Sequence, residues 1–342
     1  MSDDLQPCPQ GMDVRFVYDY NVERADMFPD HVGGVTLFIF DEDGRLVSRQ
    51  TESNSGTAQP LRDVNYRMRI DGLEPGRYRL MALATQRDYQ ELSQRSGIRY
   101  RWTDLQRGDV RTEMNIRLIN QVGSEPAEIP QMLDTLWYGT PVGETLVEVE
   151  AQQITPTTVS MIRDTKRLHL TLRQLVNRAH CDIADYEITI TDRNGRLLSD
   201  NSLDPQAPEL TYRPWAEWNT WMDSEGELYY DRATAPEGAD MTAHADIDFN
   251  RLVKRKDDPA MLTITERATG RQVASLNLAS ILAEGRGAFE TYFYSEQEYL
   301  DRAYDYYLNF ILVDGQWEEI ELVVPRLHIT PWARRFQRTI LG

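Results

Sequence analysis

The sequence predicts an all-β protein in which two antiparallel β-sandwich domains follow each other in tandem, with only short helices. Apolar residues alternate with polar ones in many short segments, turn residues separate these segments, and helical periodicity is rare. The 342 residues suit two domains, since a domain usually has about 100–200 residues. Many short strands with few helices are typical of β-sandwiches.

Strands are expected wherever the first half of the chain alternates between apolar and polar residues. The nearly continuous apolar run at 35–40 predicts a strand that is covered on both faces. The Asp43-Gly44 pair behind it predicts a hairpin turn into a return strand. Period-two alternation predicts further strands at residues 14–20, 66–70, 78–84 and 114–118.

The second half repeats this pattern. Asn194-Gly195 predicts a hairpin that leads into a strand at 197–198, and Asp314-Gly315 predicts a hairpin between the last two long strands. Alternation predicts strands at residues 168–172, 186–190, 262–264, 307–313 and 320–324.

Only two segments of the second half read as helices. Residues 276–282 place leucines and an isoleucine on one face, and Ser295 with Glu298 resembles a capping box that opens a helix at 296–304. Pro156 and its polar neighbours separate two sets of strands. The expected domains are therefore 1–155 and 156–342.

The charge and cysteine content exclude several classes of protein. The chain carries 37 Lys and Arg against 55 Asp and Glu, which gives a net charge of −18. Nucleic acid and anionic lipid are recognised through clustered basic residues, so neither is an expected partner by charge alone. Cys8 and Cys181 are too few for a disulfide scaffold or a cysteine zinc site. No apolar run approaches the ~20 residues that span a bilayer.

No motif of an enzyme or of a cofactor site occurs in the sequence. A Gly-x-Ser-x-Gly elbow, a phosphate-binding glycine loop and a dinucleotide fingerprint are all missing. The five histidines are scattered, and no two lie four residues apart as metal ligands on a helix would. We therefore expect no enzymatic activity, no cofactor and no metal, and a hydrolase would rest only on the abundant carboxylates.

The densest aromatic feature is a tryptophan cluster formed by Trp215, Trp218 and Trp221. On a helix this spacing would place the three rings on one face, where they could stack on sugar rings or anchor a partner. The alternative is that Trp215 packs into the second core while the other two cover a loop. Burial of aromatic rings favours this alternative.

Several short motifs, in their order along the chain, resemble the FimB-type fimbrial anchor lipoproteins of Bacteroidales. In the first half these are Asp4-Leu5-x-Pro7-Cys8, Val14-x-Phe16-x-Tyr18-Asp19-x-Asn21, Asp26-x-Phe28 and the run from Val32 to Phe40. In the second half they are Arg163-Asp164-Thr165-Lys166-Arg167-Leu168, Tyr212-Arg213-Pro214-Trp215, Glu298-Tyr299-Leu300-Asp301-Arg302 and Ile329-x-Pro331-Trp332. The resemblance spans nearly the whole chain.

The resemblance implies two transthyretin-like β-sandwich domains without enzymatic activity. It implies a surface-exposed lipoprotein of the cell outer membrane that holds the base of a fimbrium and contacts fimbrial stalk or accessory subunits. The lipidated cysteine would lie upstream of Ser2, and Cys8 would be the second cysteine of the family pattern. Residues 1–4 show no secretory signal, which fits either a cytoplasmic protein or an exported domain whose targeting segment has been removed.

Subunits of such fimbriae assemble by strand addition, and the C-terminal region at 321–341 is the expected polymerisation edge. Its apolar residues Leu322, Val324, Leu327, Ile329 and Trp332 could fill core positions. The alternative is that this region is simply the last strand of the second domain.

Two further alternatives concern the cysteines and the tryptophans. In an oxidising periplasm Cys8 and Cys181 could form a disulfide, or they could remain two unpaired buried thiols. The alternative to a fimbrial anchor is a glycan-binding surface lipoprotein that uses the tryptophan cluster.

Overall fold

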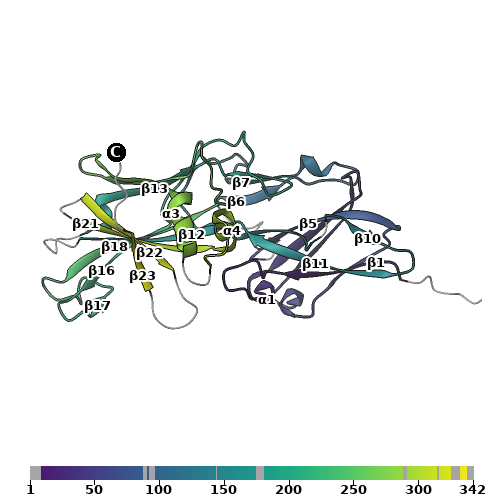
Figure 1. Ribbon diagram of the computed structural model, residues 1–342, viewed down its shortest axis with the longest axis horizontal. Helices are drawn as coiled ribbons and strands as arrows, with labels where there is room; N and C mark the ends of the chain where they lie inside the picture. The colour runs from purple at the N-terminus through teal and green to yellow at the C-terminus, as the bar shows by residue number, and fades with distance from the viewer. Residues whose placement is uncertain are drawn as a thin grey trace, which may run out of the picture. The chain divides into compact units, whose positions relative to one another are not determined.

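The computed structural model describes residues 9–87, 91, 97–143, 145–174, 181–287, 291–313, 316–324 and 332–336, and from residue 313 onward it describes the backbone only. Strands dominate these residues, as Figure 1 shows, so the predicted all-β class is confirmed. The transthyretin-like tandem arrangement stays a prediction. None of the described helices is long and apolar enough to cross a membrane.

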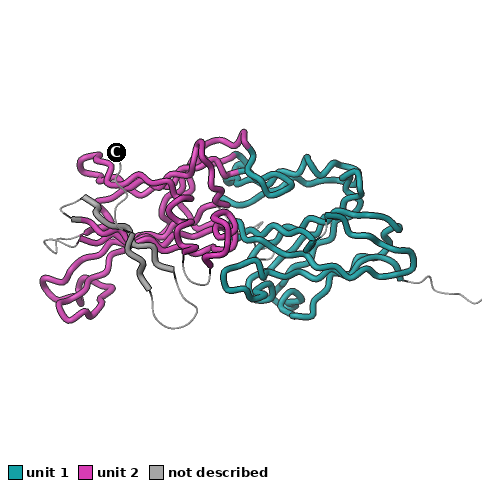
Figure 2. Tube along the Cα trace, viewed as in Figure 1, with its two compact units in different colours: residues 1–124, 134–164, 196–204 teal, residues 125–133, 165–195, 205–342 magenta. Residues whose placement is uncertain are grey.

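The chain divides into two compact units that are discontinuous in sequence (Figure 2). Unit 1 comprises residues 1–124, 134–164 and 196–204, and unit 2 comprises residues 125–133, 165–195 and 205–342. The expected junction at 155/156 lies inside strand β11 (Ile154–Arg163), which belongs wholly to unit 1. Each half of the chain therefore supplies a segment to the unit that the other half mainly forms.

Unit 1 contains a large sheet and a small one. The large sheet has the order β3 (Leu46–Ser53), β2 (Gly34–Phe40), β5 (Gly76–Thr85), β9 (Leu136–Pro141), β11, β1 (Gly11–Val17) and β4 (Met68–Asp71), and β10 (Val147–Val149) pairs with β5. The small sheet has the order β14 (Arg196–Leu198), β7 (Asn115–Ile119) and β6 (Arg99–Trp102). Three short helical turns accompany them: α1 (Phe28–His31), η1 (Pro60–Arg62) and η2 (Arg111–Glu113).

A hydrophobic core lies between the two sheets of unit 1. Phe38, Phe40, Met81 and Leu83 of the large sheet belong to the same buried cluster as Ile116 of the small sheet. Leu197 on β14, which comes from the second half of the chain, completes this cluster and is fully buried. Strand β2 is buried at every position, as its continuous apolar run predicts.

Unit 2 also contains two sheets. The larger has the order β17 (Leu228–Tyr229), β16 (Ala216–Met222), β18 (Asp240–Phe249), β12 (Lys166–Gln174), β21 (Asp305–Val313), β22 (Gln316–Val324) and β23 (Trp332–Phe336). The smaller has the order β20 (Gln272–Asn277), β19 (Met261–Glu266), β13 (Tyr186–Asp192), β15 (Leu210–Tyr212) and β8 (Glu128–Ile129). The helical elements are η3 (Ile183–Asp185), α3 (Leu278–Ala283), η4 (Glu284–Gly287) and α4 (Glu296–Arg302).

The core of unit 2 follows the predicted period of two. On β12 Leu168, Leu170 and Leu172 are buried, while His169 and Thr171 between them are partly exposed. The two sheets meet through aromatic rings, since Tyr212 on β15 packs edge-on against Phe249 on β18 with ring centroids 6.4 Å apart. A strand with one buried face and one polar face explains this alternation.

Two topological features differ from the expectation. The expected hairpin at Asn194-Gly195 is wrong, because β14 pairs with β7 of unit 1 instead of with the strand before it. The expected sheets are antiparallel, yet β1 pairs with β11, β12 with β21 and β15 with β8 in parallel. Alternation reveals which face of a strand is buried, but it does not reveal the partner strand or its direction.

The predicted helices are confirmed with shifted ends. Ser295 caps α4, since its hydroxyl oxygen accepts a hydrogen bond of 3.1 Å from the backbone N–H of Glu298. Helix α3 begins at Leu278 rather than at residue 276, because Asn277 is its cap and accepts from the N–H of Ser280 at 3.0 Å. An asparagine cap satisfies a donor that the first helical turn leaves unpaired.

Candidate functional site

The tryptophan cluster lies on a strand and not on a helix. Trp218 and Trp221 belong to β16 and lie three positions apart, so they point to opposite faces of the sheet. Trp218 keeps 38% of its surface exposed, whereas Trp221 is only 9% exposed. Trp215, directly before this strand, is half-buried. No common face of three rings therefore exists, and Trp218 is the most exposed of the three.

Trp218 lies on the non-core face of the larger sheet of unit 2, which we call the polar sheet face. Its ring stacks on His244 of β18 at a centroid distance of 5.2 Å and an interplanar angle of 12°. The imidazole of His244 is held by two hydroxyl groups, with Thr220 Oγ1 2.8 Å from Nε2 and Thr171 Oγ1 3.2 Å from Nδ1. Burial lowers the pKa of His244 against the smaller opposing effect of Asp246, so the ring is neutral at pH 7.

A second cluster of the polar sheet face fixes Trp215. The guanidinium of Arg167 binds both carboxylate oxygens of Asp248, at 2.7 and 3.2 Å, and the indole N–H of Trp215 donates to the same carboxylate at 3.2 Å. The Asp248 side chain is only 2% exposed, and it also accepts from the backbone N–H of Leu133 at 3.1 Å. The hydrogen bond to Asp248 raises the pKa of Arg167.

A third cluster joins strands β12, β18 and β21. The ring of His169 stacks on Tyr307 with centroids 4.5 Å apart, and its Nδ1 lies 2.7 Å from Asp246 Oδ1. Asp305 stands 3.9 Å from the other ring nitrogen. The strand register explains why these side chains are in contact, since His169 pairs with Asp246 on one side and with Tyr307 on the other. His169 is partly exposed opposite the buried Leu168 and Leu170, in keeping with the alternation on this strand.

Beside Trp218 the sheet carries an exposed apolar patch. Met222 lies four residues after Trp218 on the same face of β16, Leu228 pairs with Met222 from β17, and Tyr230 follows. All four side chains are exposed. We call Trp218, Met222, Leu228 and Tyr230 the hairpin patch.

The predicted polymerisation edge lies on the same sheet. Leu322 and Val324 belong to β22, which pairs with β21 on one side and with β23 on the other. Trp332 begins β23, the terminal strand in the order of this sheet, and its backbone faces Val324. Leu327 and Ile329 lie outside the described residues. The region thus contains an inner strand, β22, and an edge strand, β23. Being the last strand of unit 2 does not prevent β23 from serving as the polymerisation edge.

Of the two cysteines, only Cys181 lies within the described residues. Cys181 is buried, and burial raises the pKa of its thiol to about 11, although a hydrogen bond with Tyr186 acts in the opposite direction. Cys8 lies outside the described residues, so its pairing stays a prediction. A thiol with so high a pKa is protonated at pH 7 and reacts slowly.

No group of three or more histidine, cysteine or carboxylate side chains within the described residues could hold a metal ion. The polar sheet face instead offers flat rings and fixed carboxylates, which suit recognition by contact. The sequence identified Trp215 and Trp218 but missed Asp246, Asp248 and Tyr307. Alternation of polar and apolar residues at 240–249 and 305–313 would have indicated that these three side chains face outward.

Solved structures resemble this chain over nearly its whole length. A candidate adhesin of Bacteroides thetaiotaomicron VPI-5482 gives a TM-score of 0.76 at 26% identity and covers 93% of this chain and 97% of that chain. A candidate polysaccharide-binding protein of the same organism gives 0.72 at 29% identity, with coverage of 96% and 98%. The fimbrial anchor protein Mfa2 of Porphyromonas gingivalis shares the fold, with a TM-score of 0.62 at 17% identity and coverage of 92% and 97%.

Residues 5–336 match the family described as fimbrillin-A associated anchor proteins Mfa1 and Mfa2. The chain therefore belongs to this family of fimbrial anchor proteins, and the resemblance seen in its sequence motifs is confirmed. Its role is a fimbria-associated one. A comparison of the sequence with curated proteins finds no match.

Proposed function

We propose that this protein is a non-enzymatic anchor that holds the base of a fimbrium on the outer membrane. Its partners are fimbrial stalk or accessory subunits, which it contacts by strand addition. A lipid on a cysteine upstream of Ser2 attaches it to the membrane. The observation that carries this proposal is the family match over residues 5–336, which includes both sheets of unit 2 up to the edge strand β23.

The sheet order supports strand addition at the C-terminal end. Strand β23 is terminal in its sheet, so one side of its backbone has no ladder partner among the described strands. An open strand edge is a template for an incoming strand. Such pairing recognises the backbone of the partner and needs no catalytic group.

The charge supports attachment by a lipid. A net charge of −18 repels anionic membrane surfaces, so electrostatics cannot hold this protein there. Acyl chains instead gain about 0.8 kcal/mol for each buried methylene group, whatever the protein charge.

The test is deletion of residues 331–342 in cells that assemble the fimbrium. We expect the fraction of fimbriae retained on the cell to fall and the fraction shed into the medium to rise. The control is Leu228→Pro in β17, which disturbs the opposite edge of the same sheet. Thermal unfolding of both variants checks the fold. If the deletion variant is folded and keeps as many fimbriae on the cell as wild type does, the C-terminal edge is not the attachment site.

A second candidate function is glycan binding by Trp218. It is favoured by the exposed ring of Trp218, which His244 supports from behind at 5.2 Å. Such a flat ring can stack on the apolar face of a sugar. A glycan array decides between the candidates: sugar binding that disappears in Trp218→Ala and persists in Tyr230→Ala would favour this second one.

A further inference from the structure

The small sheet of unit 1, whose strands β7 and β6 are labelled in Figure 1, carries a row of arginines. Arg101 on β6 pairs with Arg117 on β7, and Arg117 pairs with Arg196 on β14. Side chains at directly paired positions share one face of a sheet, with Cβ atoms about 4.5–5.5 Å apart. We call Arg101, Arg117 and Arg196 the arginine row.

The burial of the neighbouring residues places this row on the outer face of the sheet. Ile116, next to Arg117, belongs to the buried core of unit 1. Tyr100 and Trp102, on either side of Arg101, pack against the same core. Successive side chains of a strand point to opposite faces, so the arginines point away from the core. Arg101 and Arg117 are accordingly exposed.

Within the described part of the chain, a carboxylate pairs with only one member of the row. Arg196 Nη1 lies 3.4 Å from Oδ2 of Asp204. Arg101 and Arg117 form no side-chain hydrogen bond and no ion pair with any described residue. The undescribed residues that precede β6, 88–90 and 92–96, include one carboxylate and one arginine, so they add no net charge. Two neighbouring guanidiniums are therefore not compensated.

The arginine row destabilises the sheet as long as no anion compensates it. Like charges directly opposite each other on paired strands repel, and this repulsion opposes pairing. An external anion that binds across the row would remove the repulsion. Guanidinium groups bind carboxylates through paired N–H donors, so carboxylates are the suitable partner among protein side chains.

The spacing of the arginines matches carboxylates on an extended polypeptide. Arg99 stands two residues before Arg101 on the same face of β6, about 7 Å away along the strand. Every second residue of any extended segment repeats at this same distance. A segment with Asp or Glu at alternate positions therefore presents its carboxylates at the spacing of these guanidiniums.

The charge of the chain argues against an anionic membrane as the occupant. A bilayer extends beneath the whole molecule, and a net charge of −18 would be repelled by its surface. A single acidic segment, in contrast, contacts only the outer face of the small sheet. Charges farther away than the Debye length of about 8 Å at physiological salt affect it little.

We propose that the arginine row docks an extended acidic segment of a fimbrial subunit, in which carboxylates occupy alternate residues. The identity of the partner as a fimbrial subunit rests on the proposed function, whereas the acidic chemistry rests on the row itself. This docking surface belongs to unit 1. It is thus distinct from the edge strand β23, which belongs to unit 2.

The first test is binding of the full chain to two labelled peptides, one of alternating Glu and Thr and one of alternating Gln and Thr. Fluorescence anisotropy at low salt should show binding of the Glu peptide and no binding of the Gln peptide. Added salt should weaken the binding, because it screens exposed charges. Arg101→Gln and Arg117→Gln should each weaken it about two- to fivefold.

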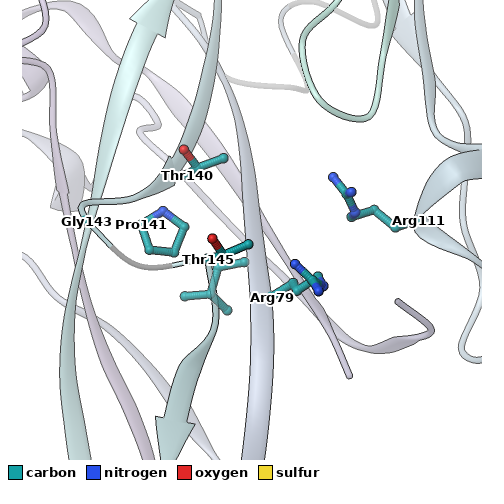
Figure 3. Close-up of a pocket in the computed structure, with 7 residues that line it drawn as sticks. Arg79, Arg111, Thr140, Pro141, Gly143 and Thr145 are labelled. Carbon is teal, nitrogen blue, oxygen red and sulfur yellow. The ribbon is translucent and has the colours of Figure 1, made fainter. Parts of the chain in front are cut away.

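The matched control is Arg79→Gln, which removes one arginine charge from β5 in the large sheet of unit 1. Figure 3 shows Arg79 at a cavity that Arg111 and Thr140 also line, outside the arginine row. Binding of the Glu peptide should be unchanged in this variant. Thermal unfolding verifies that each variant is folded.

Three results of the binding test would overturn the proposal. The first is no binding of the Glu peptide at low salt, and the second is equal weakening by Arg79→Gln and Arg117→Gln. The third is binding to phosphatidylglycerol vesicles that is lost in Arg101→Gln, without binding of the Glu peptide. That result would indicate a membrane surface as the occupant.

A test in cells that assemble the fimbrium separates docking from anchoring. Arg101→Glu combined with Arg117→Glu reverses the charge of the row and should lower the fraction of fimbriae retained on the cell. If this folded variant retains them while deletion of residues 331–342 sheds them, the docking proposal is wrong and the anchoring proposal is retained. The opposite result supports docking and excludes the C-terminal edge. Full retention in both variants would overturn both proposals.

Discussion

The guanidinium of Arg167 lies over the ring of Trp215, with its carbon 5.0 Å from the ring centroid, and both side chains donate to the carboxylate of Asp248. This arrangement joins β12, β18 and the residue before β16 across the polar sheet face. A cation over an aromatic ring adds about 0.5–2 kcal/mol, depending on solvent exposure. The conformation of Trp215 is therefore set by a buried carboxylate.

Replacing Asp248 should destabilise unit 2. Asp248→Ala leaves the Arg167 guanidinium, the Trp215 N–H and the Leu133 N–H without their acceptor, and breaking a buried ion pair costs about 3–5 kcal/mol. Urea unfolding followed by fluorescence measures this loss. Glu217→Ala, an exposed position on β16 of the same sheet, should change the free energy of unfolding by less than about 0.5 kcal/mol. Equal effects of the two variants would contradict the role of Asp248.

An apolar replacement of Lys166 should destabilise unit 2. Its side chain is fully buried on β12, and its ammonium donates to the carbonyl oxygens of Asp301 and Ala303 at 2.8 Å each. In Lys166→Met both carbonyls lose a donor, which should cost about 1–3 kcal/mol. The control is Lys254→Met, which loses only the partly exposed pair with Glu296, for about 0–1 kcal/mol. Thermal unfolding that is equal for both would contradict this prediction.

The stability of unit 2 should decrease as the pH is lowered, because of His244. Burial lowers its pKa in the folded state, so the unfolded chain binds the proton more tightly. The contribution of the neutral ring is complete above the unfolded value of about 6.5 and is lost as the pH falls through the folded value. His244→Gln should flatten the pH dependence of the free energy of unfolding below pH 7. His31→Gln, which replaces a partly exposed histidine of unit 1, is the control.

Cys181 should react with a thiol reagent only after unfolding. Its thiol is buried, and burial raises its pKa to about 11, so little thiolate exists at pH 7. Titration of the native protein should therefore leave Cys181 unmodified, as mass spectrometry of its peptide can verify. Under denaturing, non-reducing conditions two free thiols would exclude a disulfide with Cys8, and none would support it. Rapid native labelling of Cys181 would contradict its burial.

Local patterns explain much of the fold but not the site. Leu168, Leu170 and Leu172 alternate with polar residues, and that period alone predicts which face of β12 is buried. Ser295 and Asn277 act within one helical turn, where sequence distance equals spatial distance. The contact between His169 and Tyr307 depends on a parallel pairing across more than a hundred residues, which no local pattern specifies.

The pairing of strand β14 was missed because its partner strand is distant in the sequence. Leu197 has the period of a return strand, but its partner Ile116 lies in the other half of the chain. The spacing of the tryptophans did not distinguish a helix from a strand, and Trp218 and Trp221 lie on strand β16.

The exchange of segments between the units has a mechanical consequence. The chain passes from one unit to the other at 124/125, 133/134, 164/165, 195/196 and 204/205. A tensile load on unit 2 therefore reaches unit 1 through several covalent crossings, rather than through one linker that could extend like a tether. To part the units, a pull would have to strip β14 from its ladder with β7 or β8 from its ladder with β15.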